Sequence, residues 1–276
     1  MVCLDVKPFS VLMSIYHKEN ASFFKTAMES VYNQTRKPAE IILIEDGPVG
    51  DEIHQVEELF KSRTDIELKI VPLSESHQLG RALAIGLENC SCEFVARMDT
   101  DDIAHPDRFE KQMAYLDSHP DVSAVGSDIA EFINEGNIER VKKMPSEPDE
   151  VYKYGKFRNP MNHMTVMFRK QTVLEAGNYQ HFPGLEDYYL WIRMLAKGYK
   201  LANIPEVLVD ARIGETFAER RGGKEYSKRY MKLRKLQHQL GYTNKFEYLE
   251  ACILTLGMTA VPNQIRDKAY RLLRKK

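Results

Sequence analysis

The chain is poor in cysteine and contains no long run of apolar residues. It has four cysteines in 276 residues, and only one residue separates Cys90 from Cys92, too short a spacer for a zinc knuckle or a redox pair. We therefore expect no disulfide framework. The cysteines are expected to be free thiols in a reducing compartment. The longest nearly apolar stretch, 251–261, is too short to span a bilayer. Asp5 and Lys7 interrupt the start of the chain, which argues against a signal peptide.

No charge of one sign dominates the whole chain, but its two parts differ. The formal net charge is −1. Residues 212–276 hold 16 Lys and Arg against 6 Asp and Glu, a balance of +10, whereas residues 1–211 balance to −11. An acidic body with a basic C-terminal segment predicts an anionic surface as the partner of that segment. The 43% of hydrophobic residues is typical of a globular protein with a sizeable core.

Short apolar runs alternate with segments of helical spacing in the first half. Buried strands are predicted over residues 9–15, 41–45, 68–71 and 94–98, and helices within 24–31, 53–60, 79–87 and 109–116. This order predicts a mainly parallel sheet with helices on both faces. The second half is more mixed. It predicts strands over 122–127 and 164–168, a helix over 186–197, one or two short strands within 201–212, and basic helices after 213.

Three carboxylates, Asp99, Asp101 and Asp102, follow the fourth predicted strand within four residues. Clustered carboxylates are hard oxygen ligands that hold a divalent cation, which in turn holds phosphate oxygens. A solvated acidic turn would give the same pattern. These three acids alone therefore do not decide between a cation site and a solvated turn, and other residues of the chain have to do so.

Further polar residues stand where the other predicted strands and helices meet. Ser14 and Tyr16 lie at the end of the first strand, Asp46 follows the second, and Gly80 with Arg81 enters a helix. Because the carboxyl ends of parallel strands meet at one sheet edge, a nucleotide is expected there. An aspartate can accept hydrogen bonds from a base or ribose, a tyrosine can stack, and an arginine can approach phosphate.

Six segments in a fixed order make the chain similar to a known family. They are 9–16 with Glu19, 30–35, 41–47, 96–102 with 106–108, 159–163 and 186–193. Over about residues 8–213 the chain resembles the family 2 glycosyltransferases of GT-A fold. It is most similar to bacterial enzymes of the amylovoran type, which extend lipid-linked exopolysaccharide and O-antigen units. The resemblance implies an α/β fold with a Rossmann-like nucleotide-binding half and a mixed central sheet. The helical and basic pattern after residue 213 predicts a C-terminal extension.

The resemblance implies a GT-A catalytic domain over residues 1–212, with a nucleotide-sugar half up to about residue 105 and an acceptor half over 106–212. Residues 213–276 form the basic helical extension. Its last part places Ile265, Ala269, Leu272 and Leu273 beside Lys268, Arg271, Arg274, Lys275 and Lys276. This amphipathic pattern predicts docking on an anionic membrane surface, with packing on the catalytic domain as the alternative.

The resemblance also implies roles for single residues. The expected contacts of the nucleotide sugar are Ser14, Tyr16, Glu19, Asp46, Gly80, Arg81, Asp99 and Asp101. Asp99 and Asp101 match the Asp-X-Asp motif, and Asp101 with Asp102 is expected to hold Mn²⁺ or Mg²⁺. Ser14 stands where the family usually has proline, so the loop near the base can differ.

Asp187 matches the general base that deprotonates the acceptor hydroxyl. An aspartate in the first turn of a helix is also favoured by the helix dipole, so its position alone does not prove this role. Glu186 and His163 are expected on the acceptor side. For His163, ordering its own loop is the alternative.

The resemblance thus implies an inverting, metal-dependent transfer of one hexose, with UDP-galactose and a β-linkage as the best guess. The acceptor would be a saccharide on polyprenyl diphosphate, reached from the cytoplasm at the inner face of the bacterial plasma membrane. The Gln-X-X-Arg-Trp motif of processive synthases is absent, which favours single-sugar addition.

Four other classes of protein are alternatives, and the sequence argues against three of them. A sugar nucleotidyltransferase needs a glycine-rich loop after the first strand, and residues 16–20 contain no glycine. An EF-hand needs glycine where Ala104 stands, and Pro106 breaks the loop. The acidic body and the absence of nucleic-acid motifs argue against binding of nucleic acid. A non-catalytic nucleotide-sugar binder remains open.

Overall fold

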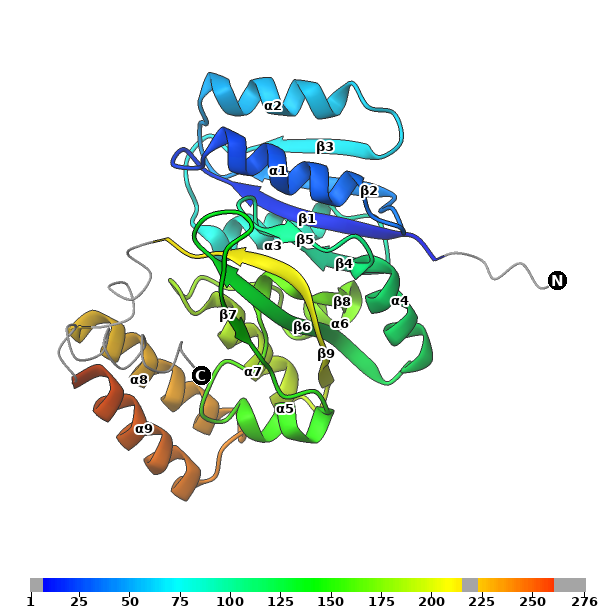
Figure 1. The fold of residues 1–276 in the computed structure, drawn as a ribbon. Coiled ribbons are helices and arrows are strands. Elements are labelled where there is room, and N and C mark those ends of the chain that lie inside the picture. Colours follow the sequence, from blue (N-terminus) through cyan, green and yellow to red (C-terminus); the bar gives the residue numbers. More distant parts are fainter. Residues whose placement is uncertain (1–6, 215–222, 261–276) are drawn as a thin grey trace.

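The computed structural model describes residues 7–214 and 223–260, which form one mixed sheet flanked by helices (Figure 1). The strands are β1 (Phe9–Ile15), β2 (Glu40–Glu45), β3 (Glu67–Pro72), β4 (Phe94–Arg97), β5 (Ile103–Ala104), β6 (Val122–Phe132), β7 (Ile138–Lys142), β8 (Met167–Arg169) and β9 (Lys200–Arg212). The helices are α1 (Ala21–Tyr32), α2 (Asp51–Lys61), α3 (Leu79–Asn89), α4 (Arg108–Ser118), α5 (Pro148–Tyr154), α6 (Lys170–Glu175), α7 (Glu186–Ala196), α8 (Lys224–Gln239) and α9 (Lys245–Ala260), with a 3₁₀ turn, η1 (His163–Thr165). The strand order is β3-β2-β1-β4-β8-β6-β9-β5, and β7 pairs with β6.

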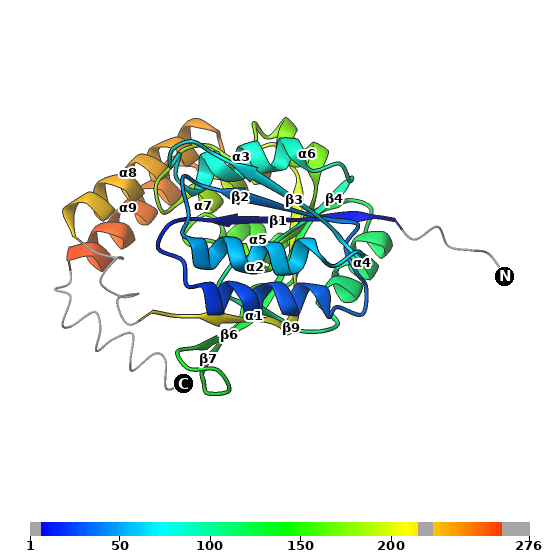
Figure 2. The same ribbon diagram turned by 90° about the horizontal axis from the view of Figure 1, so that it is seen from above.

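Strands β3, β2, β1 and β4 are mutually parallel, as the apolar runs predict. Side chains of β1 alternate between two apolar clusters: Val11 and Met13 join the cluster under α1, α2 and α4, whereas Leu12 joins the cluster under α3, α6 and α7. Figure 2 shows α1 and α2 on one face of this half and α3 and α6 on the other. Strands β1, β2 and β4 are covered on both faces and are therefore mostly apolar, whereas the edge strand β3 alternates and exposes Glu67 and Lys69.

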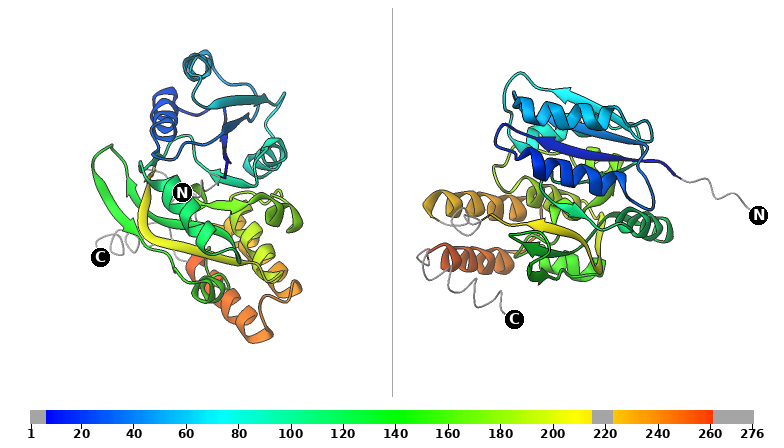
Figure 3. Two further views of the ribbon diagram at one scale, coloured as in Figure 1. Left: turned by 90° about the vertical axis from the view of Figure 1, so that its right-hand side faces the viewer. Right: turned by 45° about the horizontal axis from the view of Figure 1, so that its top comes forward.

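The second half of the sheet is mixed. β8 lies antiparallel between β4 and β6, while the long strands β6 and β9 run parallel to each other. Figure 3 shows this half curling away from the parallel strands. The segment around Pro205 forms one strand of 13 residues, where one or two short strands are expected. Ile204 pairs with Ser127 and Val207 with Asp128, so Pro205 and Glu206 form an irregularity that accommodates a residue without an N–H.

Several elements differ from the sequence expectation. The stretch 164–168, expected to be a strand, divides into η1 and the shorter β8, because Thr165 turns back to accept and donate hydrogen bonds with Ser127 and Asn162. The short elements β5, β7, α5 and α6 are not predicted. Each is too short or too exposed to show a clear apolar period.

Helix α8 belongs to the folded core. Arg234 is 3% exposed and donates hydrogen bonds to the Lys156 carbonyl at 3.0 Å and to the Tyr188 hydroxyl at 3.0 Å, and Leu233 joins the cluster around α7. The first part of the predicted basic extension therefore packs on the body. The expected apolar stripe of residues 265–273 and its basic neighbours lie outside the described residues.

Glu57 on α2 is a buried acid close to a second one. Its side chain is 2% exposed, it contacts His54 at 2.9 Å, and the carboxylate of Glu45 lies in the same group of atoms within 4.8 Å. Burial is the main reason that the pKa of Glu57 rises to about 7, and the Glu45 charge adds to it. The folded state thus holds this proton more tightly than the unfolded chain does, so stability falls as the pH rises from the unfolded pKa to about 7.

Glu57→Gln is expected to stabilise the fold above neutral pH, because a neutral amide of the same shape has no proton to lose. Chemical denaturation at about pH 8 should show the variant about 1–3 kcal/mol more stable than the wild type, with the difference vanishing near about pH 5. Glu58→Gln is the matched control, since Glu58 is exposed one residue further along. Equal stability of the Glu57→Gln variant and the wild type at both values would contradict the assignment.

Candidate functional site

The ends of three adjacent parallel strands bring the predicted donor-side residues to one edge of the sheet. Ser14 lies half-buried near the end of β1, Asp46 follows β2, and Asp99 follows β4. Because β1 pairs with both β2 and β4, these residues stand side by side although up to 85 residues separate them in the chain. The sequence prediction of a shared sheet edge is confirmed.

The acid cluster (Asp99, Asp101 and Asp102) is compact. One carboxylate oxygen from each lies within 4.8 Å of the others. Burial is the largest cause, and the Asp99 charge the next, of a rise in the pKa of Asp101 to about 7. The same two causes hold the pKa of Asp102, which is 2% exposed, well above its usual value. Three acids gathered out of water repel one another, so this arrangement favours a positive ligand.

Two arginines hold the cluster in place. Arg97, 1% exposed, forms an ion pair with Asp99. Arg212, the last residue of β9, donates its backbone N–H to Asp102 Oδ1 at 2.7 Å and its Nε–H to the Asp101 carbonyl at 3.0 Å. The second oxygen of Asp102 is buried and has no hydrogen-bond partner. A buried, orphaned carboxylate oxygen beside two further carboxylates fits the oxygen ligand set of Mn²⁺ or Mg²⁺.

Asp46 is fixed by the segment before α3. Its Oδ2 accepts from the Ser76 hydroxyl at 2.9 Å and its Oδ1 from the His77 backbone N–H at 2.6 Å. Gly47 has φ +85°, and a Cβ there would lie 2.9 Å from the Ser76 nitrogen, so the turn requires glycine. The carboxylate is thereby oriented at the sheet edge by two partners far away in sequence.

The loop after β1 reaches the acid cluster. Glu19 accepts a hydrogen bond from the Thr100 hydroxyl at 2.7 Å, and its charge contributes to the raised pKa of Asp101. Tyr16, at the start of this loop, is 44% exposed and can present its ring to a ligand. Glu19 therefore connects this loop to the cluster, and the nucleotide contacts of Tyr16 and Glu19 stay predictions.

Gly80 lets the start of α3 approach the start of α7. A Cβ at this position would lie 2.8 Å from the Gln180 carbonyl and 3.1 Å from Cβ of Glu186, so the first turn of α3 touches the first turn of α7 only because residue 80 has no side chain. The neighbouring Arg81 is exposed. Two helix N-termini, whose N–H groups favour anions, thus converge beside the same sheet edge.

Asp187 lies in the first turn of α7 and is held by one side chain. The Asn159 amide donates to its Oδ2 at 2.6 Å. Burial raises the pKa of Asp187, while the Asn159 hydrogen bond and the nearby Lys142 act in the opposite direction. Burial, with the Asp187 charge as a second cause, raises the pKa of Glu186 to about 7. Two adjacent acids with raised pKa values suit proton transfer near neutral pH.

His163 lies in the interior. It is 9% exposed, its Nε2 contacts the Tyr179 hydroxyl at 3.0 Å, and its ring stands 6.2 Å from that of Trp191. Burial, aided by Arg97, lowers the pKa of His163 well below its usual value, so the ring is neutral. Its predicted contact with the acceptor stays a prediction.

Sequence reasoning missed three residues that the fold places in the site. Asn159 lies in the segment 159–163 used for the resemblance, but nothing in a single sequence pairs it with Asp187 28 residues later. In the sequence alone, Arg212 is only the last residue of a predicted strand, and nothing distinguishes Lys142 from other surface lysines. Their roles follow from contacts between distant strands, which no local spacing encodes.

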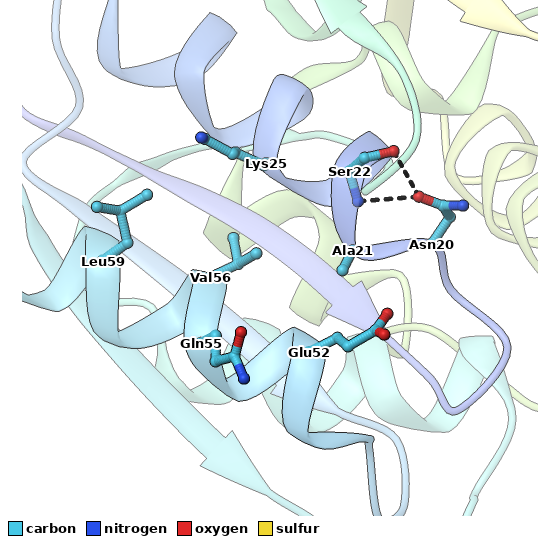
Figure 4. Close-up of a pocket in the computed structure, with 8 residues that line it drawn as sticks. All are labelled: Asn20, Ala21, Ser22, Lys25, Glu52, Gln55, Val56 and Leu59. Carbon is cyan, nitrogen blue, oxygen red and sulfur yellow. Dashed lines mark hydrogen bonds between the residues drawn. The ribbon is translucent and has the colours of Figure 1, made fainter.

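A hollow of about 530 Å³ lies elsewhere, between α1 and α2 (Figure 4). Its lining residues are Asn20, Ala21, Ser22, Lys25, Glu52, Gln55, Val56 and Leu59. None of these is a predicted site residue. Asn20 there caps α1, accepting from the Ser22 backbone N–H at 2.9 Å, which accounts for its orientation.

Mn²⁺ is expected to stabilise the fold through the acid cluster, because it relieves the repulsion among buried carboxylates. At a concentration of about 100 Kd the ligand adds about 2.7 kcal/mol, which a thermal-shift titration detects as a rise in melting temperature. Asp102→Asn should remove most of this rise, whereas the exposed control Asp149→Asn should keep it. An unchanged Mn²⁺ shift in the Asp102→Asn variant would place the cation elsewhere.

The chain matches a known family and several characterised relatives. Residues 10–177 match the family described as Glycosyl transferase family 2. The chain is 42% identical over 235 residues to the amylovoran biosynthesis glycosyltransferase AmsE of Erwinia amylovora, covering 85% of this chain and 87% of the relative. It is 34% identical over 268 residues to the UDP-Gal:alpha-D-GlcNAc-diphosphoundecaprenol beta-1,3-galactosyltransferase of Escherichia coli, covering 97% and 96%.

The fold also has solved counterparts. The mannosyltransferase PcManGT from Pyrobaculum calidifontis, solved in complex with GDP-Man and Mn²⁺, superposes with a TM-score of 0.65 at 14% identity, covering 98% of this chain and 81% of that one. At this identity the likeness concerns the fold. The family match, the sheet topology and the acid cluster all point to the same assignment. The chain belongs to the family 2 glycosyltransferases and has the GT-A fold.

Proposed function

We propose that the protein transfers a single hexose, with inversion, from a nucleotide sugar to a saccharide carried on polyprenyl diphosphate, with a divalent cation at the acid cluster. The observation that carries the proposal is the presence of two acid sets: the compact cluster of Asp99, Asp101 and Asp102, proposed for the donor side, and Asp187 held by Asn159, proposed for the acceptor side. The E. coli relative, named for a UDP-Gal donor and a diphosphoundecaprenol acceptor, supports UDP-galactose and a β-linkage.

Direct displacement needs one base and one stabilised leaving group. The acceptor hydroxyl attacks the anomeric carbon on the face opposite the nucleoside diphosphate, a new glycosidic C–O bond forms, and the C–O bond to the diphosphate breaks. The hydroxyl proton passes to the Asp187 carboxylate, which the Asn159 amide orients through its hydrogen bond to Oδ2. Inversion follows because a single displacement occurs without a covalent enzyme intermediate.

Asp99, Asp101 and Asp102 would hold the cation, and Arg97 and Arg212 keep them in position. The chemistry supplied by bound Mn²⁺ or Mg²⁺ is neutralisation of the charge that grows on the departing diphosphate. The Mn²⁺ in the solved PcManGT complex supports this choice of cofactor.

The donor side would bind the nucleoside through Asp46 and Tyr16. Asp46 is oriented by Ser76 and His77, and Tyr16 offers an exposed ring for stacking on a base. Gly80 allows α3 to approach α7, and Arg81 in the same turn is exposed for contact with phosphate. Ser14 and Glu19 would complete this wall of the pocket.

We also propose that the reaction takes place at the cytoplasmic face of the bacterial plasma membrane, where a polyprenyl carrier resides. The basic balance of +10 over residues 212–276 supports attraction to anionic lipid. No helix within residues 7–214 and 223–260 is long and apolar enough to cross a bilayer. The division into a donor half, an acceptor half and a C-terminal extension belongs to the same proposal.

A donor panel tests the reaction. With Mn²⁺ and a GlcNAc-diphosphate-lipid acceptor, the wild type should release nucleoside diphosphate with UDP-galactose and give a product one hexose heavier. Asp187→Asn should lower kcat about 10²–10⁴-fold with donor affinity unchanged. A variant that keeps wild-type kcat would remove Asp187 from the role of base. Donor binding without turnover by the wild type on any acceptor would favour the non-catalytic binder.

Asn159→Ala tests the partner of the base. Its hydrogen bond lowers the pKa of Asp187, so its loss should move the acidic limb of the kcat/KM profile toward higher pH. Activity near about pH 6 should fall by about tenfold if the limb moves by about one unit. Asn134→Ala, in the exposed β6–β7 turn, should leave the profile in place. A reduced rate with an unshifted limb would mean that Asn159 acts only on structure.

A further inference from the structure

Helix α9 exposes large apolar side chains along one side. Phe246 is 86% exposed, Leu249 58% and Ile253 61%, and their spacing of three and four residues places them on one helical face. Leu254, 48% exposed, lies beside them. We call Phe246, Leu249, Ile253 and Leu254 the outer face of α9. Such contiguous exposed apolar surface is uncommon on a soluble monomer and marks a contact site.

The opposite side of α9 fixes this orientation. Ala251 and Cys252 are buried, and the Tyr248 ring stacks on His238 of α8 at 5.1 Å and 16°. The Glu247 carboxylate pairs with Lys156 of the main body at 2.5 Å and caps the helix start by accepting from the Asn244 N–H at 2.9 Å. The helix therefore cannot rotate to hide the outer face without breaking these contacts.

The surroundings of the outer face are basic. Residues 224–260 hold seven Lys and Arg against three Asp and Glu. Lys224, Lys228, Lys232 and Lys235 are exposed on α8, and Lys245 is exposed at the start of α9. Glu250 is exposed on the outer face itself, so the basic excess comes from α8 and the start of α9. Exposed apolar side chains on a hairpin that also exposes lysines complement the headgroup region of an anionic bilayer, where apolar side chains enter and cations meet phosphate. Two copies of this chain would instead bring like charges together.

The hairpin of α8 and α9 is attached to the acceptor side of the site. Helix α8 lies between α7 and α9 (Figure 1). Arg229 donates to the Pro183 carbonyl at 2.8 Å, and Lys232 Nζ stands 5.4 Å from the Phe182 ring, in the loop that leads into α7. Asp187 lies in the first turn of α7. A surface that holds α9 is therefore joined, through α8, to the proposed base.

We infer that the outer face of α9 inserts into the headgroup region of an anionic lipid bilayer and so holds the acceptor side of the site at the membrane surface. The inference rests on the proposed function for its lipid-linked acceptor, but the membrane contact itself involves no sugar chemistry. In this arrangement the apolar side chains of α9 insert into the headgroup region, and the lysines of α8 attract the anionic lipids.

Vesicle co-sedimentation of the full chain tests the contact. The wild type should bind vesicles that contain phosphatidylglycerol and bind vesicles of pure phosphatidylcholine more weakly. The triple variant Phe246→Ser/Leu249→Ser/Ile253→Ser should lose binding about tenfold or more. The control Leu59→Ser/Ile138→Ser/Val141→Ser, which removes three exposed apolar residues elsewhere, should bind as the wild type does.

Kinetics with two acceptors separate this inference from the proposed function. The triple variant should keep the wild-type rate with a short-chain, water-soluble acceptor and show a raised KM for a long-chain acceptor embedded in vesicles. If the wild type turns over neither acceptor yet binds vesicles, the proposed function fails and the inference stands. The inference is overturned if the wild type does not bind anionic vesicles, or if the triple variant binds them equally well. It is also overturned if light scattering shows a wild-type dimer that the triple variant converts to monomer.

Discussion

Three carboxylates lie close together after β4, one of them buried and two partly exposed, and their mutual repulsion constrains this edge of the sheet. Charged groups that leave water and lie within 4.8 Å of each other are unfavourable unless cations compensate them. Arg97 supplies one positive charge through its ion pair with Asp99. The end of β9, in the second half of the sheet, brings Arg212 into hydrogen-bond contact with Asp101 and Asp102. The donor edge is thus completed only when both halves of the sheet are folded.

A close approach of two helix starts brings together the residues proposed for the donor and those proposed for the acceptor. Helices α3 and α7 begin side by side because Gly80 lets the backbone of Gln180 and the side chain of Glu186 approach. Helix α3 follows the segment that orients Asp46, and α7 opens with Glu186 and Asp187. The proposed nucleotide contacts and the proposed base are therefore positioned by two helices in direct contact.

The C-terminal helices extend this chain of contacts to the surface. Arg234 buries its guanidinium against the Lys156 carbonyl and the Tyr188 hydroxyl, so α8 is held to α7 by directed hydrogen bonds as well as by apolar contact. Helix α9, one layer farther out, leaves its apolar side chains uncovered. The acid cluster, helix α7 with the proposed base, α8 and α9 thus follow one another outward. The outermost helix exposes the face that we propose to contact lipid.

Local patterns in the sequence are enough to predict the parallel half of the sheet and the acidic residues at its edge. Fully apolar runs followed by Asp46 and by the Asp99–Asp102 run can be identified locally, because a strand covered on both faces needs apolar residues throughout and its end is where polar ones begin. The tertiary structure alone decided the partners: Asn159 for Asp187, Arg212 for Asp102, and the uncovered face of α9. These depend on which strands and helices become neighbours, and the energy of such long-range contacts leaves no period or spacing in the chain.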